Sequence, residues 1–307
     1  MTIRDITRAA TLVLALVAGL ARGAASQDLE PRAYSASPVG TTFVVAAVGR
    51  SSGNVLTDPS LPVEDVQATL GIATAGAGYT FDLLSRTALV LAAFPYGRAH
   101  ATGRVQEAAA EVSRVGWADA RFKLSVNLIG GKALRRSEFA TARRSTIVGV
   151  SLTAVAPTGQ YFSDKLVNLG SNRWSLKPEA GVSFPLGHFS IDGYAGVWLF
   201  GSNDQFYPGT ALREQERVIA FQGHASYTFR PRLWAAIDGT WYTGGSTTVN
   251  GVAKGDLQRN SRLGATVSVP LGGRQSLKGS FSTGASTRIG ADFNTMTVAW
   301  QMSWLGR

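Results

Sequence analysis

The feature that most constrains this chain is a period of two in hydrophobicity, which returns in segment after segment from residue 41 to the C-terminus. In residues 119–128, apolar side chains occupy the even positions, and charged or polar side chains occupy the odd positions. The same division recurs in residues 219–230, 261–269 and 295–304. Because successive side chains of a β-strand point to opposite faces, the pattern predicts strands with one oily and one polar face.

Two kinds of connection alternate between the predicted strands. The short ones are turns at residues 82–85, 185–188, 230–232 and 271–274, and the long ones are polar segments at residues 51–65, 96–116, 158–173, 201–217 and 244–260. Short turns at one rim and long loops at the other are typical of bacterial outer-membrane barrels, whereas a soluble sandwich has no reason to keep this order. We therefore predict an all-β fold, a closed antiparallel transmembrane β-barrel of about twelve strands with both termini on the periplasmic side.

Two connections depart from this order. Residues 130–144 form a long segment where a short turn is expected, and residues 287–294 form a short one where a long loop is expected. Within the first of them, residues 132–142 are predicted to carry a helical turn at the rim.

The N-terminal residues have the organisation of a cleavable signal peptide. Arg4 and Arg8 precede an apolar stretch at residues 9–20, and small residues follow at positions 23–26. The apolar stretch is too short to cross a bilayer, and no later segment has the roughly 18 uninterrupted apolar residues that a spanning helix needs. We expect a signal peptide at residues 1–26, a periplasmic N-terminal segment at residues 27–40 and an outer-membrane barrel at residues 41–307. The protein would then reach the outer membrane through the general secretory route; the alternative is an N-terminal membrane anchor.

Composition excludes several classes of function. Charged residues make up 16% of the chain, against about 25% in typical soluble proteins. The sequence has no cysteine and three histidines, which leaves little material for a metal site, and we expect no metal, no cofactor and no catalytic residue. The net charge of +10 comes from dispersed side chains, so we expect no nucleic acid as a partner.

If the oily face meets outer-membrane lipid, the polar face lines a lumen. The candidate lumen-lining residues carry both signs of charge: Asp119, Arg121, Lys123, Lys177, Glu179, Asp192, His224, Asp238, Arg262 and Lys278. In a narrow barrel, these side chains either neutralise one another in a closed network or form a polar constriction that selects solutes by size and charge. The sequence leaves both arrangements open.

Several motifs resemble those of one family of bacterial outer-membrane proteins. They are LEPRAYS at residues 29–35, DPSLP at 58–62, PTGQY at 157–161, NLGSNRW at 168–174, KPE at 177–179, REQ at 213–215 and RIGADF at 288–293. The chain is similar over nearly its whole mature length to the Putative MetA-pathway of phenol degradation family, which is commonly described as transporters. The resemblance implies an outer-membrane transporter or channel for small organic or aromatic solutes, and it assigns no catalytic residue.

Loop residues within these motifs are further candidates for a constriction or for ligand recognition at the mouth: Asn168, Asn172, Arg173, Arg213, Glu214 and Gln215. Two other functions stay open. One is a structural or surface-interaction barrel with a closed lumen. The other is a membrane-embedded lipid hydrolase that uses His224 and Ser226, although no acidic or amide side chain is evident to orient the histidine.

Overall fold

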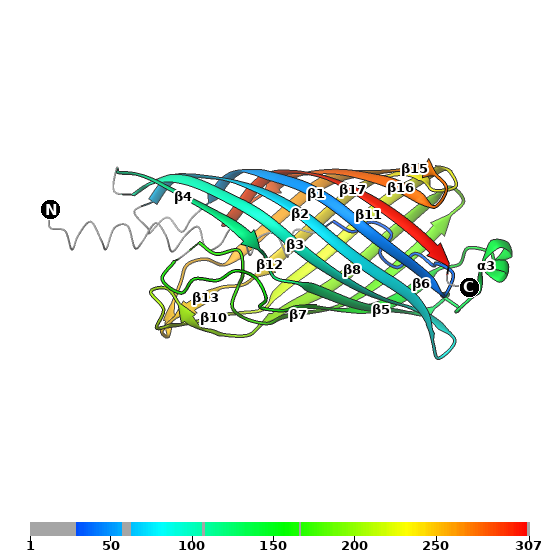
Figure 1. The fold of residues 1–307 in the computed structure, drawn as a ribbon, viewed down its shortest axis with the longest axis horizontal. Helices are drawn as coiled ribbons and strands as arrows, with labels where there is room; N and C mark the ends of the chain where they lie inside the picture. Colours follow the sequence, from blue (N-terminus) through cyan, green and yellow to red (C-terminus); the bar gives the residue numbers. More distant parts are fainter. Residues whose placement is uncertain (1–28, 57–62, 106–107, 166, 306–307) are drawn as a thin grey trace.

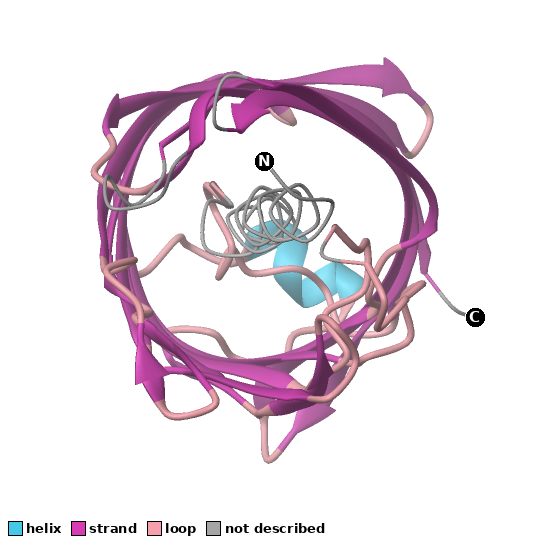
Figure 2. Ribbon diagram, turned by 90° about the vertical axis from the view of Figure 1, so that its left-hand side faces the viewer, coloured by secondary structure: helices cyan, strands magenta, loops and turns pink. Residues whose placement is uncertain are grey.

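The computed structural model describes residues 29–56, 63–105, 108–165 and 167–305. The predicted signal peptide lies outside the described residues, as does the DPSLP motif at 58–62. Within them, the strands form the closed ring that Figure 2 shows end-on. No helix among the described residues is long and apolar enough to cross a membrane.

The main sheet has 13 strands, of which β4 (Ala108–Trp117) pairs only with β3. The others follow one another around the ring: β1 (Thr41–Leu56), β2 (Val63–Leu83), β3 (Arg86–Val105), β5 (Arg121–Ile129), β6 (Ile147–Val155), β7 (Ser175–Leu186), β8 (Phe189–Phe200), β11 (Val218–Arg230), β12 (Leu233–Gly244), β15 (Gln258–Gly272), β16 (Gln275–Ser286) and β17 (Gly290–Leu305). The ring closes between β1 and β17, which pair from Thr41 opposite Leu305 to Leu56 opposite Gly290. The predicted closed barrel of about twelve antiparallel strands is thus confirmed.

One end of the barrel holds the tight turns. Leu84 and Ser85 connect β2 to β3, and both have positive φ angles, as the two central residues of a type I′ hairpin turn require. The helix α3 (Arg136–Thr141) lies at the same end as the C-terminus (Figure 1). It falls inside residues 132–142, where the sequence predicted a helical turn at the rim.

Two of the predicted long loops are wrong, because the structure continues the strands through most of them. β1 extends to Leu56, and β3 extends to Val105 before β4 returns to Trp117. Polar residues in these segments suggested loops, but a hairpin that projects beyond the bilayer has water on both faces and can be polar throughout. The predicted loops at 201–217 and 244–260 also contribute a small second sheet of β9 (Asn203–Phe206), β10 (Ala211–Gln215), β13 (Thr247–Val249) and β14 (Val252–Ala253).

The outer wall of the barrel is apolar and exposed. On β5, Phe122 and Leu124 are exposed, while the alternate residues Ser125 and Asn127 are buried on the inner side. Exposed aromatic rings stand near strand ends, among them Tyr79, Trp174, Phe184 and Trp241. A continuous exposed apolar wall with aromatic rings at its edges suits the hydrocarbon and interface of a bilayer.

Candidate functional site in the barrel lumen

The N-terminal segment, here residues 29–36, lies inside the barrel. Tyr34 is only 1% exposed, and its hydroxyl lies 3.1 Å from Ser151 Oγ and donates to Glu179 Oε1 at 3.2 Å. The side-chain amide of Asn127 donates to the Tyr34 carbonyl at 3.2 Å. The sequence predicted a periplasmic segment at residues 27–40; residues 29–36 of it pack against the inner wall, and Val39 and Gly40 bond to Leu134 and Thr80 near the short turns. These distant hydrogen-bond partners are what hold it there.

Two glycines make room for the Tyr34 ring. Gly149 of β6 and Gly181 of β7 lie opposite each other in the ladder. A Cβ atom at either position would come 2.3 Å from a ring carbon of Tyr34, far inside van der Waals contact. Tyr194 meets the same ring edge-on, with centroids 5.2 Å apart. The barrel wall is therefore shaped to accept this one side chain.

Charged groups hold the rest of the segment. Arg32 donates from Nε to Ser226 Oγ at 2.9 Å and from Nη2 to Thr228 Oγ1 at 2.7 Å. Glu30, which precedes the spanning strands, forms an ion pair of 2.5 Å with Lys123 Nζ. The positive charge of Lys123 lowers the pKa of the Glu30 carboxyl to about 2. Glu30 is therefore ionised at any physiological pH.

A row of buried polar side chains crosses the half of the barrel nearer the short turns. Asp192 of β8 and Asp238 of β12 lie opposite His224 of β11, one on each side. His224 Nδ1 is 2.7 Å from Asp238 Oδ1, and Thr266 donates to Asp238 Oδ2 at 2.7 Å. All four side chains are nearly inaccessible. Packed polar side chains therefore line this end of the lumen.

Asp238 is the acidic orienter of His224 that the sequence did not reveal. A signal was available, because the two residues are equally distant from Pro231 in the predicted turn and a hairpin pairs such positions. Ser226 faces the lumen beside them, where it accepts the Arg32 hydrogen bond. His224 and Ser226 therefore do not lie on the lipid-facing wall.

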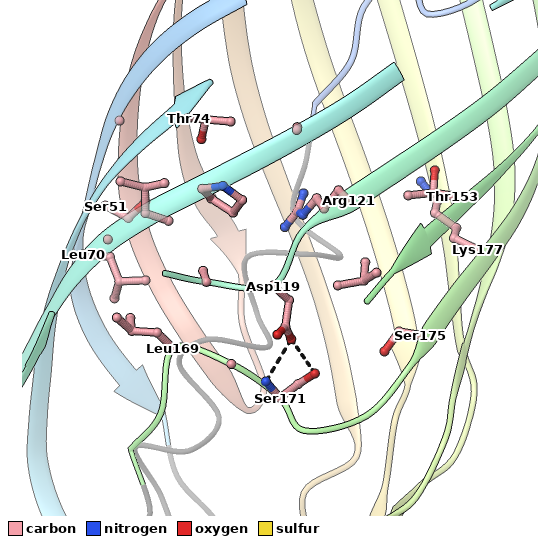
Figure 3. Close-up of a pocket in the computed structure, with 18 of the residues that line it drawn as sticks. Ser51, Leu70, Thr74, Asp119, Arg121, Thr153, Leu169, Ser171, Ser175 and Lys177 are labelled. Carbon is pink, nitrogen blue, oxygen red and sulfur yellow. Dashed lines mark hydrogen bonds between the residues drawn. The ribbon is translucent and has the colours of Figure 1, made fainter. Parts of the chain in front are cut away.

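The half of the lumen nearer the long loops contains a cavity of about 430 Å³. One wall is formed by apolar side chains, including Leu70, Ile72, Leu91 and Leu169. Across from Leu70 and Leu169, Figure 3 shows Lys177 on the opposite wall and Arg121 reaching into the space. Glu30 of the N-terminal segment borders the cavity as well.

Asp119 borders the cavity but is fully engaged. Its Oδ1 accepts the Gly159 N–H at 2.9 Å, and its Oδ2 accepts from Ser171 N at 2.8 Å and Ser171 Oγ at 2.6 Å (Figure 3). These hydrogen bonds tie the β6–β7 connection to the short chain between β4 and β5. Asp119 thus shapes the cavity mouth.

The other lumen candidates are mostly paired. Lys177 and Glu179 form an ion pair of 2.5 Å, and Glu179 also accepts from Gln222 Nε2 at 3.4 Å. Arg262 is buried and donates to the Phe293 carbonyl at 2.7 Å. Lys278 is exposed. Lys123 and Lys177 line the cavity. The charge of each is neutralised by its ion-pair partner, Glu30 or Glu179.

The six loop candidates chiefly bind one another and neighbouring loops. Asn168 bonds to both main-chain groups of Phe162, and Asn172 donates to Asn203 at 2.9 Å. The remaining contacts are Arg173 with Gln215, Arg213 over the Phe206 ring, and Thr248 with Glu214. Asn168 and Arg173 border the cavity, whereas Asn172, Arg213, Glu214 and Gln215 are not among its lining residues.

Aromatic residues of the cavity were missed in the sequence analysis. Trp198 and Phe200 of β8 line it, as does Phe206 of β9. Their even positions in residues 189–200, shared with the lumen candidate Asp192, would have placed Trp198 and Phe200 on the inner face.

A closed barrel with an apolar outer wall, short turns at one end and a partly filled lumen defines the class as an outer-membrane β-barrel. The family model described as Putative MetA-pathway of phenol degradation matches residues 46–297. The chain belongs to this family. No curated protein sequence matches it significantly.

Two solved structures share the fold. The COG4313 outer membrane channel from Pseudomonas putida F1 has a TM-score of 0.78 at 21% identity, with 90% of this chain and 100% of that chain covered. The transport unit of the autotransporter AIDA-I from Escherichia coli has a TM-score of 0.50 at 12% identity, with 98% and 97% covered. The similar architecture places this protein among outer-membrane barrels.

Proposed function

We propose that this protein is an outer-membrane channel that admits small, partly apolar organic solutes, including aromatic ones, through the cavity in its lumen. The observation that carries the proposal is the cavity of about 430 Å³ with one apolar and one basic wall. Sites for small molecules have volumes of this order and combine an apolar lining with a few polar groups. The similar structure from Pseudomonas putida F1 is an outer membrane channel, which supports this proposal.

The lining suggests a role for each wall. Leu70, Ile72 and Leu91 would receive the apolar body of a solute, and Arg121 would orient its polar end, since the charge of Lys177 is neutralised by Glu179. Trp198 and Phe200 add aromatic surface beside Lys177, which favours planar rings.

Uptake into liposomes tests the proposal. Relative to protein-free liposomes, refolded protein should admit the benzoate anion faster than glucose. The substitution Ile72→Asn should reduce this preference, because it places a polar group on the apolar wall. Leu212→Asn at an exposed position of β10, away from the cavity, is the matched control and should leave the preference unchanged. Absence of both solute uptake and conductance in planar bilayers would overturn the proposal.

A second candidate is a structural or surface-interaction barrel with a closed lumen. The packed N-terminal segment and the paired charges favour it. A hydrolase is less well supported, since His224 and Ser226 face the lumen and Ser226 is held by Arg32. Phospholipase activity that is lost in His224→Ala would establish the enzyme and exclude a channel as the principal function.

A further inference from the structure

The outer wall carries two arginines on neighbouring sides of β2. Arg50 of β1 and Arg98 of β3 both lie opposite Gly71, one from each side. Directly opposed residues of an antiparallel ladder share a face. The shared face is the outer one, because Gly49 and Ser51, the neighbours of Arg50, line the lumenal cavity.

The alternation of β3 gives the same orientation for Arg98. Gly97 and Ala99, the neighbours of Arg98, are buried on the inner side, whereas Arg98 is exposed. Arg98 is among the residues that border the cavity because it is part of the barrel wall there. Val115, its partner on β4, is also exposed. Arg50 and Arg98 are therefore two strand spacings apart on one outer surface, or about 10 Å.

Both arginines stand at the edge of the apolar band. The outward residue immediately before Arg98 on β3 is Tyr96, which meets Trp117 edge-on at 5.3 Å. These rings are 44% and 58% exposed, as expected of an aromatic belt at a membrane interface. On β1, the exposed Val48 precedes Arg50 in the same way. Arg50 and Arg98 stand at the edge of the apolar band that is nearer the long loops, which is the extracellular side.

The charges of this pair are not neutralised by the protein. Within the described ranges, neither guanidinium has a hydrogen bond or an ion pair, and neither is among the residues with further interactions. None of their outward neighbours in the ladder is acidic: Val48, Ser52, Gly71, Tyr96, His100, Val115 and Met296. A Cβ atom at Gly71 would have no heavy atom within 4 Å, so the surface between the arginines is open.

We propose that Arg50 and Arg98 bind the phosphate groups of lipid A, the phosphorylated and multiply acylated glucosamine disaccharide of the outer leaflet. Guanidinium groups match phosphate in charge and in hydrogen-bond geometry. The acyl chains would lie along the apolar band below, and the open surface at Gly71 would receive the sugar. This site lies on the outer wall and is independent of solute passage through the lumen.

Binding of lipid A to the refolded protein in detergent micelles tests the proposal. The probe is bisphosphorylated lipid A, compared with the same lipid after phosphatase treatment. The double variant Arg50→Gln/Arg98→Gln should weaken binding of the phosphorylated lipid by about a hundredfold, since each of the two charge-assisted hydrogen bonds contributes about tenfold. Binding of the dephosphorylated lipid should already be weak and should not change in the variant.

Arg104→Gln is the matched control. Arg104 lies farther along β3 from the membrane and has Asp65 as an ion-pair partner at 3.6 Å, so its loss should leave lipid A binding unchanged. Equal affinity of the wild-type protein for both lipids would overturn the proposal, and this comparison does not depend on whether the variants fold. An equal loss in Arg104→Gln and in the double variant would overturn it as well.

Discussion

The two halves of the lumen differ in how their polar groups are satisfied. Toward the short turns, Asp192, His224 and Asp238 are buried side by side, and Tyr34 fills the space between two glycines. Toward the long loops, the lumen keeps a cavity bordered by apolar side chains on one wall and by Arg121 and Lys177 on the other.

The difference shows how a narrow barrel can pack one half of its interior and keep a cavity in the other. Buried charges persist only when they are paired or hydrogen-bonded, and near the short turns His224 Nδ1 and both carboxylate oxygens of Asp238 meet this condition. Within the described residues, Asp192 Oδ2 and His224 Nε2 have no hydrogen-bond partner. The other half keeps an unfilled cavity, where Lys123 and Lys177 are paired with Glu30 and Glu179. The N-terminal segment joins the two halves, since Tyr34 belongs to the packed region and Glu30 borders the cavity.

The largest expected effect is on the packed half. Asp238→Ala would leave His224 and Thr266 without their shared acceptor. We expect the free energy of unfolding to fall by about 3 kcal/mol, the cost of breaking a buried charged hydrogen-bond network. Urea unfolding of the refolded protein in lipid vesicles measures it. Asp164→Ala, which removes an exposed ion pair with Lys165, should hardly change the free energy of unfolding. Equal losses of unfolding free energy in the two variants would show that the buried row does not stabilise the barrel more than a surface pair does.

A smaller effect should follow from disturbing the segment that joins the halves. Gly181→Ala places a methyl group against the Tyr34 ring, and such overpacking costs about 1–3 kcal/mol. Expulsion of the segment should raise single-channel conductance and expose the Arg32–Ala33 bond to trypsin. Gly223→Ala is the control, because its Cβ would meet no heavy atom within 4 Å. Unchanged conductance together with unchanged trypsin resistance would show that the N-terminal segment does not depend on the space that Gly149 and Gly181 leave for Tyr34.

The smallest effect concerns pH. Because Lys123 depresses the pKa of Glu30 to about 2, their ion pair should stabilise the segment fully above about pH 4.5 and lose this contribution as pH falls toward 2. Glu30 is half-exposed, so water and salt weaken the effect. Trypsin sensitivity cannot be followed in acid, but the conductance of the wild-type protein should rise over this range. In Glu30→Gln, conductance should already be raised at neutral pH and change little on acidification; parallel titrations would contradict this role.

The sequence predicted the barrel well and its interior less well. Alternation identified the strand faces, as in Phe122 against Ser125, because side-chain direction in a strand depends only on local geometry. The loops at 51–65 and 96–116 were wrong, because polar composition does not distinguish a hairpin in water from an irregular loop. The pairing of His224 with Asp238 could have been predicted, because a hairpin pairs residues that are equally distant from its turn. The pairing of Lys123 with Glu30 was not, because it joins segments that no turn connects.

By itself, the sequence determined that this protein crosses a membrane with strands, which face of each strand meets lipid, and on which side the turns are short. These properties follow from a local period and from the need to satisfy every backbone group within a bilayer. The tertiary structure decided that residues 29–36 lie inside the barrel, that Tyr34 fits between Gly149 and Gly181, and that a cavity remains beside them. Such contacts depend on the stagger of strands around the closed ring, which brings together residues far apart in the chain.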